Sequence, residues 1–397
     1  MRDFISSRVL SIASSPLSEF LTLTQGVKNI ISLGIGEPDF VTPYHIREEM
    51  IDSLLDGQTQ YTDSRGIQPL REAIAAYLKE RHDLCYDPNS EIIVTIGASE
   101  AIDLVFRTVL EEGDEVLLPD PGYISYEPCV RLSGGVPVPV ATDSTFQLTG
   151  QALEECVTPR SKVLVLSYPN NPTGAVLDDE HLQQIVDVCK RHNLLVISDE
   201  IYNELVYDGV RQRSVAALPG MRERTATLNG FSKAFAMTGQ RIGYVAAPEY
   251  LTAAFSKVHT NTILCASRTS QMGALAALVE GQRTDYQEVA KMRDSYDARR
   301  RLMVHAFSEM GLECYEPKGA FYMFPSIKST GLSSREFCKR LLEEEGVVCI
   351  PGHAFGKMGE GHIRCCYATA HERLMEAFSR MRAFLERLRS QSCSNDC

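Results

Sequence analysis

The sequence lacks the features that mark membrane and exported proteins. No stretch approaches the roughly 18 consecutive apolar residues that a transmembrane helix needs. The opening residues, MRDFISSRVLSIASSPLSEF, contain no continuous apolar segment of the kind found in signal peptides. We therefore expect a cytoplasmic protein that has no membrane as a partner.

Basic runs are also absent. The chain holds 40 Lys and Arg against 52 Asp and Glu, which gives a formal net charge of −12. Such a charge disfavours binding to nucleic acid or to anionic membranes. The composition over 397 residues, 44% hydrophobic and 23% charged, is that of an ordinary globular protein. We expect two domains and small-molecule ligands.

Patterns typical of metal sites and disulfide frameworks are missing as well. The 12 cysteines are scattered along the chain, and no CxxC pair is matched to a second ligand pair at zinc spacing. A chain of this length can bury a sufficient core without disulfides. We predict reduced thiols and no metal site.

Short apolar strand patterns alternate with helical patterns through most of the chain. In segment 178–193, Leu182, Ile185 and Cys189 recur at helical spacing between two strand patterns. Repeated strand, helix, strand units build a mainly parallel sheet with helices on both faces. We predict such an α/β domain over residues 43–290. Its strands are IIVTIG (92–97), EVLLP (115–119), VPVPVA (136–141), KVLVLS (162–167), LLVISD (194–199), TATLNG (225–230) and IGYVAAP (242–248).

The pattern changes near residue 285. Longer helices follow, as in 288–310, with a few strands such as 319–325. No repeat and no linker rich in Pro, Gly or Ser divides the chain. We predict a smaller α+β domain formed by residues 1–42 and 291–397.

Candidate ligand-binding residues come directly after several predicted strands. Ligands of open α/β sheets bind beyond the carboxyl ends of the strands. Ala98 and Ser99, in GASEAIDL, would offer backbone N–H groups to a phosphate at the start of a helix, and Arg241 could bind the same phosphate. An ordinary structural turn at Ala98 and Ser99 is the alternative.

Two charged side chains follow other strands. Asp199 ends an apolar strand, where a carboxylate needs a cationic partner such as a protonated pyridine nitrogen; a helix N-cap is the alternative. Lys233 lies among small and aromatic residues that would lower its pKa by burial and make the amine a nucleophile able to form a Schiff base. A solvated loop lysine is the alternative. Tyr202 could reach the same ligand, and Asn171 is either a further contact or a turn residue.

Nine motifs occur in the order found in a known family. They are LGIGEPDF, YTDSRGIQPLREAI, GASEAIDL, DPGYISY, YPNNPTG, SDEIY, SKAFAMTGQRIG, GAFYMFP and GHIRCCYA. On these motifs the chain resembles, over essentially its whole length, the class I/II aminotransferases of the aspartate aminotransferase superfamily. The resemblance implies the fold type I architecture, pyridoxal 5′-phosphate as cofactor and a homodimer with shared active sites.

The resemblance also implies roles for residues of the motifs. Lys233 would form the Schiff base with the cofactor, Asp199 would keep the pyridine nitrogen protonated, and Arg364 would bind the substrate α-carboxylate. The other implied contacts are Tyr202 and Asn171 with the phenolic oxygen, Tyr123 with the ring, Ala98, Ser99 and Arg241 with the phosphate, Tyr61 with the phosphate of the neighbouring subunit, and Gly36 with the substrate.

Two positions depart from the family pattern. Gln240 stands where relatives often carry tryptophan, which this chain lacks entirely, and Gly230 stands where some relatives have a serine that helps to bind phosphate. We expect altered packing at Gln240 and one phosphate contact fewer at Gly230.

The resemblance predicts an aminotransferase of amino acid metabolism or biosynthesis. It would move the amino group of an acidic or broad range of L-amino acids to a 2-oxo acid, expected to be 2-oxoglutarate, by a ping-pong mechanism. Arg107 is a candidate for binding a side-chain carboxylate, with a solvated or dimer-contact arginine as the alternative. The alternative functions are a carbon–sulfur β-lyase on the same fold and a non-catalytic regulatory or binding module. A DNA-binding regulator would need a longer segment than 1–42 before the large domain.

Overall fold

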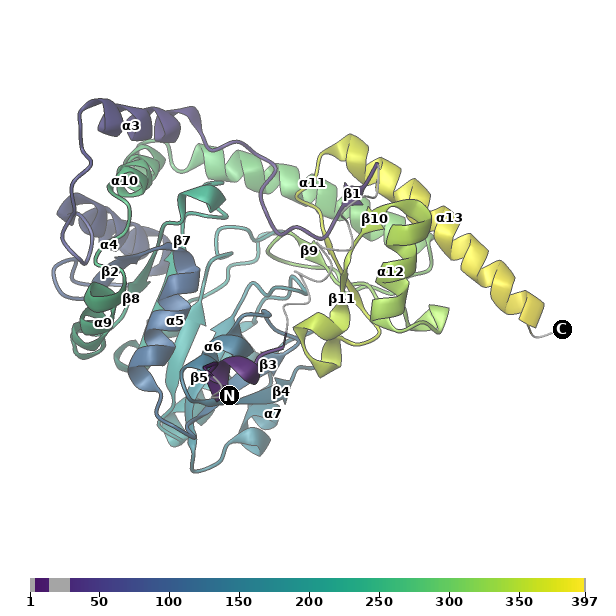
Figure 1. Ribbon diagram of the computed structural model, residues 1–397, viewed down its shortest axis with the longest axis horizontal. Helices are drawn as coiled ribbons and strands as arrows, with labels where there is room; N and C mark the ends of the chain where they lie inside the picture. The colour runs from purple at the N-terminus through teal and green to yellow at the C-terminus, as the bar shows by residue number, and fades with distance from the viewer. Residues whose placement is uncertain (1–3, 14–28, 396–397) are drawn as a thin grey trace.

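The computed structural model describes residues 4–13 and 29–395, without the side chains of 392–395 (Figure 1). A larger body surrounds a seven-stranded sheet, and a smaller body surrounds several short strands. Helix α11 (Gln287–Glu309) runs from the larger body into the smaller one. The predicted division into 43–290 and 1–42 with 291–397 stays a proposal, and its boundary at residue 290 lies in the first turn of α11.

The large sheet is mainly parallel, as predicted. Its strand order is β2-β8-β7-β6-β5-β3-β4, and only β8 runs antiparallel to its neighbours. The strands are β2 (Ile92–Thr95), β3 (Glu115–Asp120), β4 (Val136–Ala141), β5 (Ser161–Ser167), β6 (Leu195–Asp199), β7 (Thr225–Gly230) and β8 (Gly243–Ala246). Each lies within two residues of the strand expected from the sequence.

The direction of β8 follows from the segment that precedes it. Residues 231–242, between β7 and β8, contain no α-helix that could cross a face of the sheet, as a parallel connection requires. The chain therefore turns at the carboxyl end of β7 and returns antiparallel. This connection carries both Lys233 and Arg241, so the turn places them at that edge of the sheet.

Side chains alternate between two cores on the two faces of the sheet. Val163, Val165 and Ile197 pack with α5, α6 and α9, whereas Leu164 and Val196 pack with α7 and α8. Because neighbouring residues of a strand point to opposite faces, these nearly continuous apolar strands need helices on both sides. The helices are α5 (Gly97–Val109), α6 (Tyr126–Leu132), α7 (Gly150–Cys156), α8 (Asp179–Arg191) and α9 (Glu249–Thr262).

A third apolar cluster covers the β2–β8 end of the sheet. Here α4 (Gln68–His82) and α10 (Arg268–Arg283) pack against Ile92, Val94 and Tyr244, and α3 (Tyr44–Leu55) packs on α10 (Figure 1). The short helix α1 (Ser7–Leu10) lies near α6.

The smaller body is built by both ends of the chain. Strand β1 (Ile31–Ser32) pairs in parallel with β10 (Val347–Val348), beside α12 (Ser334–Glu345) and α13 (His371–Asn395). A separate antiparallel sheet has the order β11-β12-β9, formed by β11 (Ile350–Pro351), β12 (Ile363–Cys366) and β9 (Tyr322–Met323). One core holds these elements together, and Tyr202 and Leu205 of the larger body are part of it. Segment 31–37 and β12 are thereby fixed against the large sheet.

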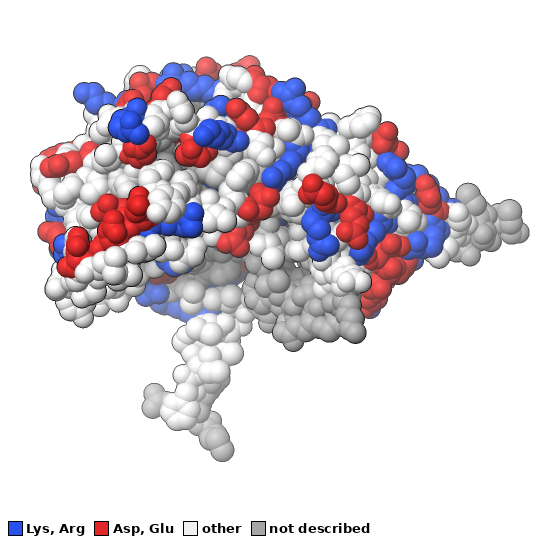
Figure 2. Space-filling view, turned by 90° about the horizontal axis from the view of Figure 1, so that it is seen from above, with Lys and Arg blue, Asp and Glu red and all other residues white. Residues whose placement is uncertain are grey.

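Acidic and basic side chains are interspersed on the face shown in Figure 2, and no broad patch of one sign covers it. Among the described helices, none is long and apolar enough to cross a membrane.

Candidate active site

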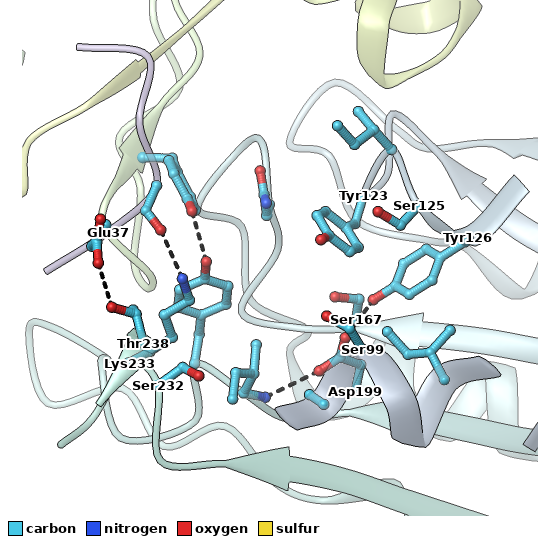
Figure 3. Close-up of a pocket in the computed structure, with 18 of the residues that line it drawn as sticks. Glu37, Ser99, Tyr123, Ser125, Tyr126, Ser167, Asp199, Ser232, Lys233 and Thr238 are labelled. Atoms are coloured by element: carbon cyan, nitrogen blue, oxygen red, sulfur yellow. Dashed lines mark hydrogen bonds between the residues drawn. The ribbon is translucent and has the colours of Figure 1, made fainter. Parts of the chain in front are cut away.

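A cavity of about 560 Å³ lies between the carboxyl ends of the large sheet and the smaller body (Figure 3). Apart from Tyr61 and the candidate Arg107, every predicted site residue lines it. These residues are Gly36, Ala98, Ser99, Tyr123, Asn171, Asp199, Tyr202, Lys233, Arg241 and Arg364. The tertiary structure thus brings together groups that are spread over more than 300 residues of sequence.

The Lys233 amine is withdrawn from water. It follows β7, and its Nζ donates a hydrogen bond to the Gly36 carbonyl oxygen at 2.7 Å (Figure 3). The rings of Tyr202 and Phe321 lie 5.9 and 5.7 Å from Nζ. Burial lowers the pKa of this amine to about 8, with a smaller effect of the Arg364 charge in the same direction. A substantial fraction is therefore neutral near pH 8, as a nucleophile or a base must be.

Asp199 is a buried carboxylate held by neutral groups. It is the last residue of β6 and accepts hydrogen bonds from Tyr126 Oη at 2.7 Å and from the Ile201 N–H at 3.3 Å (Figure 3). Burial raises its pKa, while the hydrogen bond from Tyr126 acts in the opposite direction. A cationic ligand in the cavity would therefore be strongly favoured beside it.

Sequence reasoning missed Tyr126. The motif DPGYISY contains two tyrosines, and the prediction used only Tyr123. Both line the cavity, but Tyr126 begins α6 and is turned toward Asp199 (Figure 3). Its position three residues after Tyr123 was the signal that could have found it.

The other end of the cavity is suited to an anion. Ala98 and Ser99 lie in the first turn of α5, where backbone N–H groups lack helical partners. Arg241 approaches them closely because Gly97, at φ +71°, has no side chain: a β-carbon there would lie 2.6 Å from Arg241 Nη2. Gly243 is required in the same way, since its β-carbon would lie 2.7 Å from the Ala98 nitrogen.

Arg364 forms the third charged feature of the cavity. Its guanidinium lies between the rings of Tyr322 and Phe355, with Cζ at 4.5 and 4.9 Å from the ring centres. Nη1 donates to Asn171 Oδ1 at 2.9 Å and Nη2 to the Gly34 carbonyl oxygen at 2.6 Å, whereas the buried Nε has no partner. A planar cation with a free donor is a carboxylate-binding group.

Tyr322 is a second residue that the sequence did not single out. Its hydroxyl and that of Tyr202 are 2.7 Å apart, and burial raises the pKa of both phenols. Gly36 lies against it so closely that a β-carbon would be 2.1 Å from Tyr322 Oη. The motif GAFYMFP was recognised, but only the fold showed which of its residues reaches the cavity.

Two predicted residues lie elsewhere. Tyr61 is 80% exposed and does not line the cavity of its own chain. Arg107 lies in the last turn of α5, about 12 Å along the helix from its cavity end at a rise of about 1.5 Å per residue. Its Nε donates to Asp103 at 2.6 Å on the surface. The hypothesis that Arg107 binds a substrate carboxylate in its own chain is therefore wrong.

Gly230 and Gln240, the two residues that depart from the family pattern, lie in different structural environments. Gly230 pairs with Gly243 across β7 and β8, and a β-carbon there would lie 3.0 Å from the Ile242 carbonyl oxygen. A serine at Gly230 would need the strands to move apart slightly. Gln240 is half-buried in the turn before Arg241.

Comparison with known proteins agrees with this site. The profile of the family "Aminotransferase class I and II" matches residues 28–381. The "Aspartate aminotransferase" of Pyrococcus abyssi is 45% identical over 96% of this chain and 98% of its own length, and the "Aromatic-amino-acid aminotransferase 2" of Thermococcus litoralis is 44% identical over the same shares. The solved aromatic aminotransferase of Pyrococcus horikoshii OT3 superposes with a TM-score of 0.88, at 45% identity over 94% of this chain and 99% of that one.

The chain belongs to the class I and II aminotransferase family. It has the fold type I architecture of that family and is a pyridoxal-phosphate-dependent transaminase.

The cavity fits this cofactor on observations of the structure itself. Among the described residues Asp199 has hydrogen bonds only from neutral groups, and a protonated pyridine nitrogen would supply a cationic partner. Gly97 and Gly243 leave space where Arg241 meets the start of α5, which suits a phosphate. The partly neutral Lys233 amine, in the same cavity, suits an aldehyde.

The lowered pKa of Lys233 predicts the pH dependence of cofactor capture. Below pH 8 the amine is protonated and cannot attack an aldehyde, so the capture rate of the cofactor-free protein should rise about tenfold per pH unit and level off above pH 8. Stopped-flow absorbance between pH 6.5 and 10 measures this rate, with Lys233→Ala as the control. A rate that still rises steeply near pH 10 would show an ordinary lysine.

Proposed function

We propose that this aminotransferase works by a ping-pong reaction in which Lys233 both holds the cofactor and moves the proton of the substrate α-carbon. The observation that carries the proposal is the buried Lys233 amine, in one cavity with the Asp199 carboxylate and the Arg364 guanidinium. When bound, pyridoxal phosphate supplies an aldehyde for the amino group and an electron sink for the α-carbon.

Other residues of the chain would hold the cofactor in place. Asp199 would keep the proton on the pyridine nitrogen, and Tyr126 would orient that carboxylate. Tyr202 and Asn171 would contact the phenolic oxygen, and Tyr123 would lie against the ring. The N–H groups of Ala98 and Ser99 would bind the phosphate together with Arg241.

Arg364 would bind the substrate α-carboxylate. The Tyr322 and Phe355 rings pack against its guanidinium and restrict its orientation. Arg364 would thereby hold the amino group of each substrate near Lys233, and Gly36, which also lines the cavity, would lie against the substrate.

The charged residues that line the cavity favour an enzyme that accepts a broad range of amino donors over one that is specific for acidic amino acids. Three cations line it in the described part of the chain, Lys233, Arg241 and Arg364, and each has a role already. Apolar residues that also line the cavity include Phe355 and Ile350 beside Arg364, together with Ile35, Ile124 and Ala354. Relatives named for aspartate and for aromatic amino acids are almost equally similar to this chain, which supports broad use.

The second carboxylate of the expected acceptor, 2-oxoglutarate, would lie near the same apolar residues. It would be held through its α-carboxylate at Arg364, as the donor is. Apolar 2-oxo acids such as phenylpyruvate should therefore also accept the amino group, since they bury their side chains against these residues.

A half-reaction screen tests the proposed function and its donor range. Loss of cofactor aldehyde absorbance is followed without an acceptor, and phenylalanine, leucine and methionine should react at least as well as aspartate and glutamate. Arg364→Lys should weaken every donor by about 2–5 kcal/mol, as for a buried charge contact.

A roughly hundredfold preference for aspartate over phenylalanine would contradict the broad donor range. Release of pyruvate and ammonia from cysteine without any acceptor would point to the β-lyase reaction. A protein that reacts with no amino acid would contradict the proposed function altogether.

Replacing Asp199 tests its role at the ring nitrogen. Asp199→Asn should retain the cofactor but lose about 10²-fold or more in turnover, because a neutral amide cannot stabilise a protonated pyridine. Tyr126→Phe is the matched control, since it removes one hydrogen bond to the same carboxylate and leaves the charge in place. Its effect should be about 1.5 kcal/mol, the low end for a hydrogen bond to a charged group. Single-turnover kinetics compares the two, and normal turnover in Asp199→Asn would exclude the role.

We further propose that the active unit is a cytoplasmic homodimer in which Tyr61 contacts the phosphate bound by the neighbouring subunit. Tyr61 is exposed in its own chain, although the loop that carries it is anchored by buried groups. An exposed aromatic side chain on an anchored loop suits a contact with a second copy.

Hybrid dimers test the position of Tyr61. When Lys233→Ala chains are mixed with Tyr61→Phe chains, a shared site places both defects in one active site and leaves the other intact. Hybrids should then contain one site of full activity, which active-site titration of purified hybrids measures. Exposed Tyr250, replaced by Phe, is the control. If each hybrid instead has one inactive site and one weakened site, Tyr61 acts within its own chain.

A further inference from the structure

A buried histidine lies behind the phosphate end of the cavity. His259, on α9, has no exposed side-chain surface, and α9 packs beside α5 (Figure 1). Its Nδ1 is 2.6 Å from Glu100 Oε1, and its Nε2 is 2.8 Å from the Ser64 carbonyl oxygen. None of these three residues was singled out in the sequence, and none lines the cavity.

The two contacts determine where the protons lie. The Ser64 carbonyl oxygen can only accept, so Nε2 must carry a hydrogen. Nδ1 faces a carboxylate oxygen, so a second proton lies between His259 and Glu100. With Glu100 ionised, the ring is an imidazolium that donates at both nitrogens, and the pair is neutral overall.

Glu100 connects this pair to the start of α5. Its second oxygen accepts from the backbone N–H of Ile96, the residue at the N-cap. Ala98 and Ser99, whose N–H groups are assigned to the phosphate, follow within the same turn. An unpaired carboxylate here would repel a bound phosphate, because the Glu100 side chain is only 12% exposed and water screens it little, and a charge on His259 cancels that repulsion.

Ser64 connects the pair to the loop that carries Tyr61. The same loop is held on its other side by buried Gln271, which donates to Thr62 Oγ1 at 3.1 Å and accepts from the Ile67 N–H at 2.7 Å. His259 thus joins the two segments of the chain to which phosphate contacts are assigned, although it touches neither the cavity nor the ligand.

We propose that His259, through its pair with Glu100, is a positioning residue for the cofactor phosphate. It neutralises the carboxylate at the start of α5 and fixes the Tyr61 loop through the Ser64 carbonyl group. The inference rests on the phosphate site of the proposed function.

The test compares pyridoxal 5′-phosphate with pyridoxal, which lacks the phosphate. In His259→Gln, the buried Glu100 loses its counter-charge, so the purified holoenzyme should release pyridoxal phosphate about tenfold faster or more. The affinity of the cofactor-free protein for pyridoxal should change less than about twofold. Adding Glu100→Gln to this variant should bring pyridoxal phosphate release back to within about threefold of the wild type, because no buried charge then remains.

Thr252→Val is the matched control. Thr252 is buried on the same helix and donates to the Ser90 carbonyl oxygen at 2.5 Å, away from Ser64 and Glu100. It should leave the ratio of the two affinities unchanged. If His259→Gln weakens pyridoxal and pyridoxal phosphate equally, or weakens neither, the positioning role is wrong.

If His259→Gln does not fold, the double variant carries the test. It must release pyridoxal phosphate within about threefold of the wild type, and a larger loss shared by pyridoxal overturns the inference. A wild-type protein that binds neither compound would contradict the proposed function instead.

Discussion

Withdrawal of charge from water into one cavity is the constraint on which the rest of this structure depends. The Asp199 carboxylate and the Arg364 guanidinium are buried and Lys233 is half-buried, and isolated charges in such settings are disfavoured. Neutral hydrogen-bond donors and aromatic rings contact these charged groups: Tyr126 donates to Asp199, and the Tyr322 ring packs against Arg364. Because these partners do not neutralise the charges, the charges remain available to a cofactor and a substrate.

The backbone supplies the geometry that makes this burial possible. Parallel strands β5, β6 and β7 end at one edge of the sheet, so the residues after them converge on the same cavity. The smaller body closes the opposite side with Arg364 on β12 and with segment 31–37, which reaches Lys233 through the Gly36 carbonyl oxygen. Gly36, Gly97 and Gly243 are needed where side chains and backbone approach closer than a β-carbon allows.

Charge balance extends behind the cavity to residues that no ligand touches. At the phosphate end, two positive features meet: the start of α5 and the Arg241 guanidinium. Glu100 is an acid in that same first turn, and its carboxylate lies 2.6 Å from Nδ1 of the buried His259, which we propose balances its charge. On this proposal, phosphate binding would depend on α9 and on the loop at Ser64 as well as on the residues that line the cavity. On this view, buried residues in the core of the larger body contribute to the electrostatic potential at the cavity.

The sequence by itself determined the strands of the large sheet, its mainly parallel arrangement, the family and ten of the residues that line the cavity, because strand patterns and the family's motifs are local features of the chain. It did not determine the direction of β8, the roles of Tyr126 and Tyr322, or the pairing of His259 with Glu100 and Ser64. It also offered Arg107 as a candidate for binding a substrate carboxylate, whereas Arg107 lies on the surface of α5, where it donates a hydrogen bond to Asp103. These features are contacts between segments distant in the chain or directions around a helix axis. Only the packing of the complete tertiary structure fixes them, since no local pattern records which side chains meet across a core.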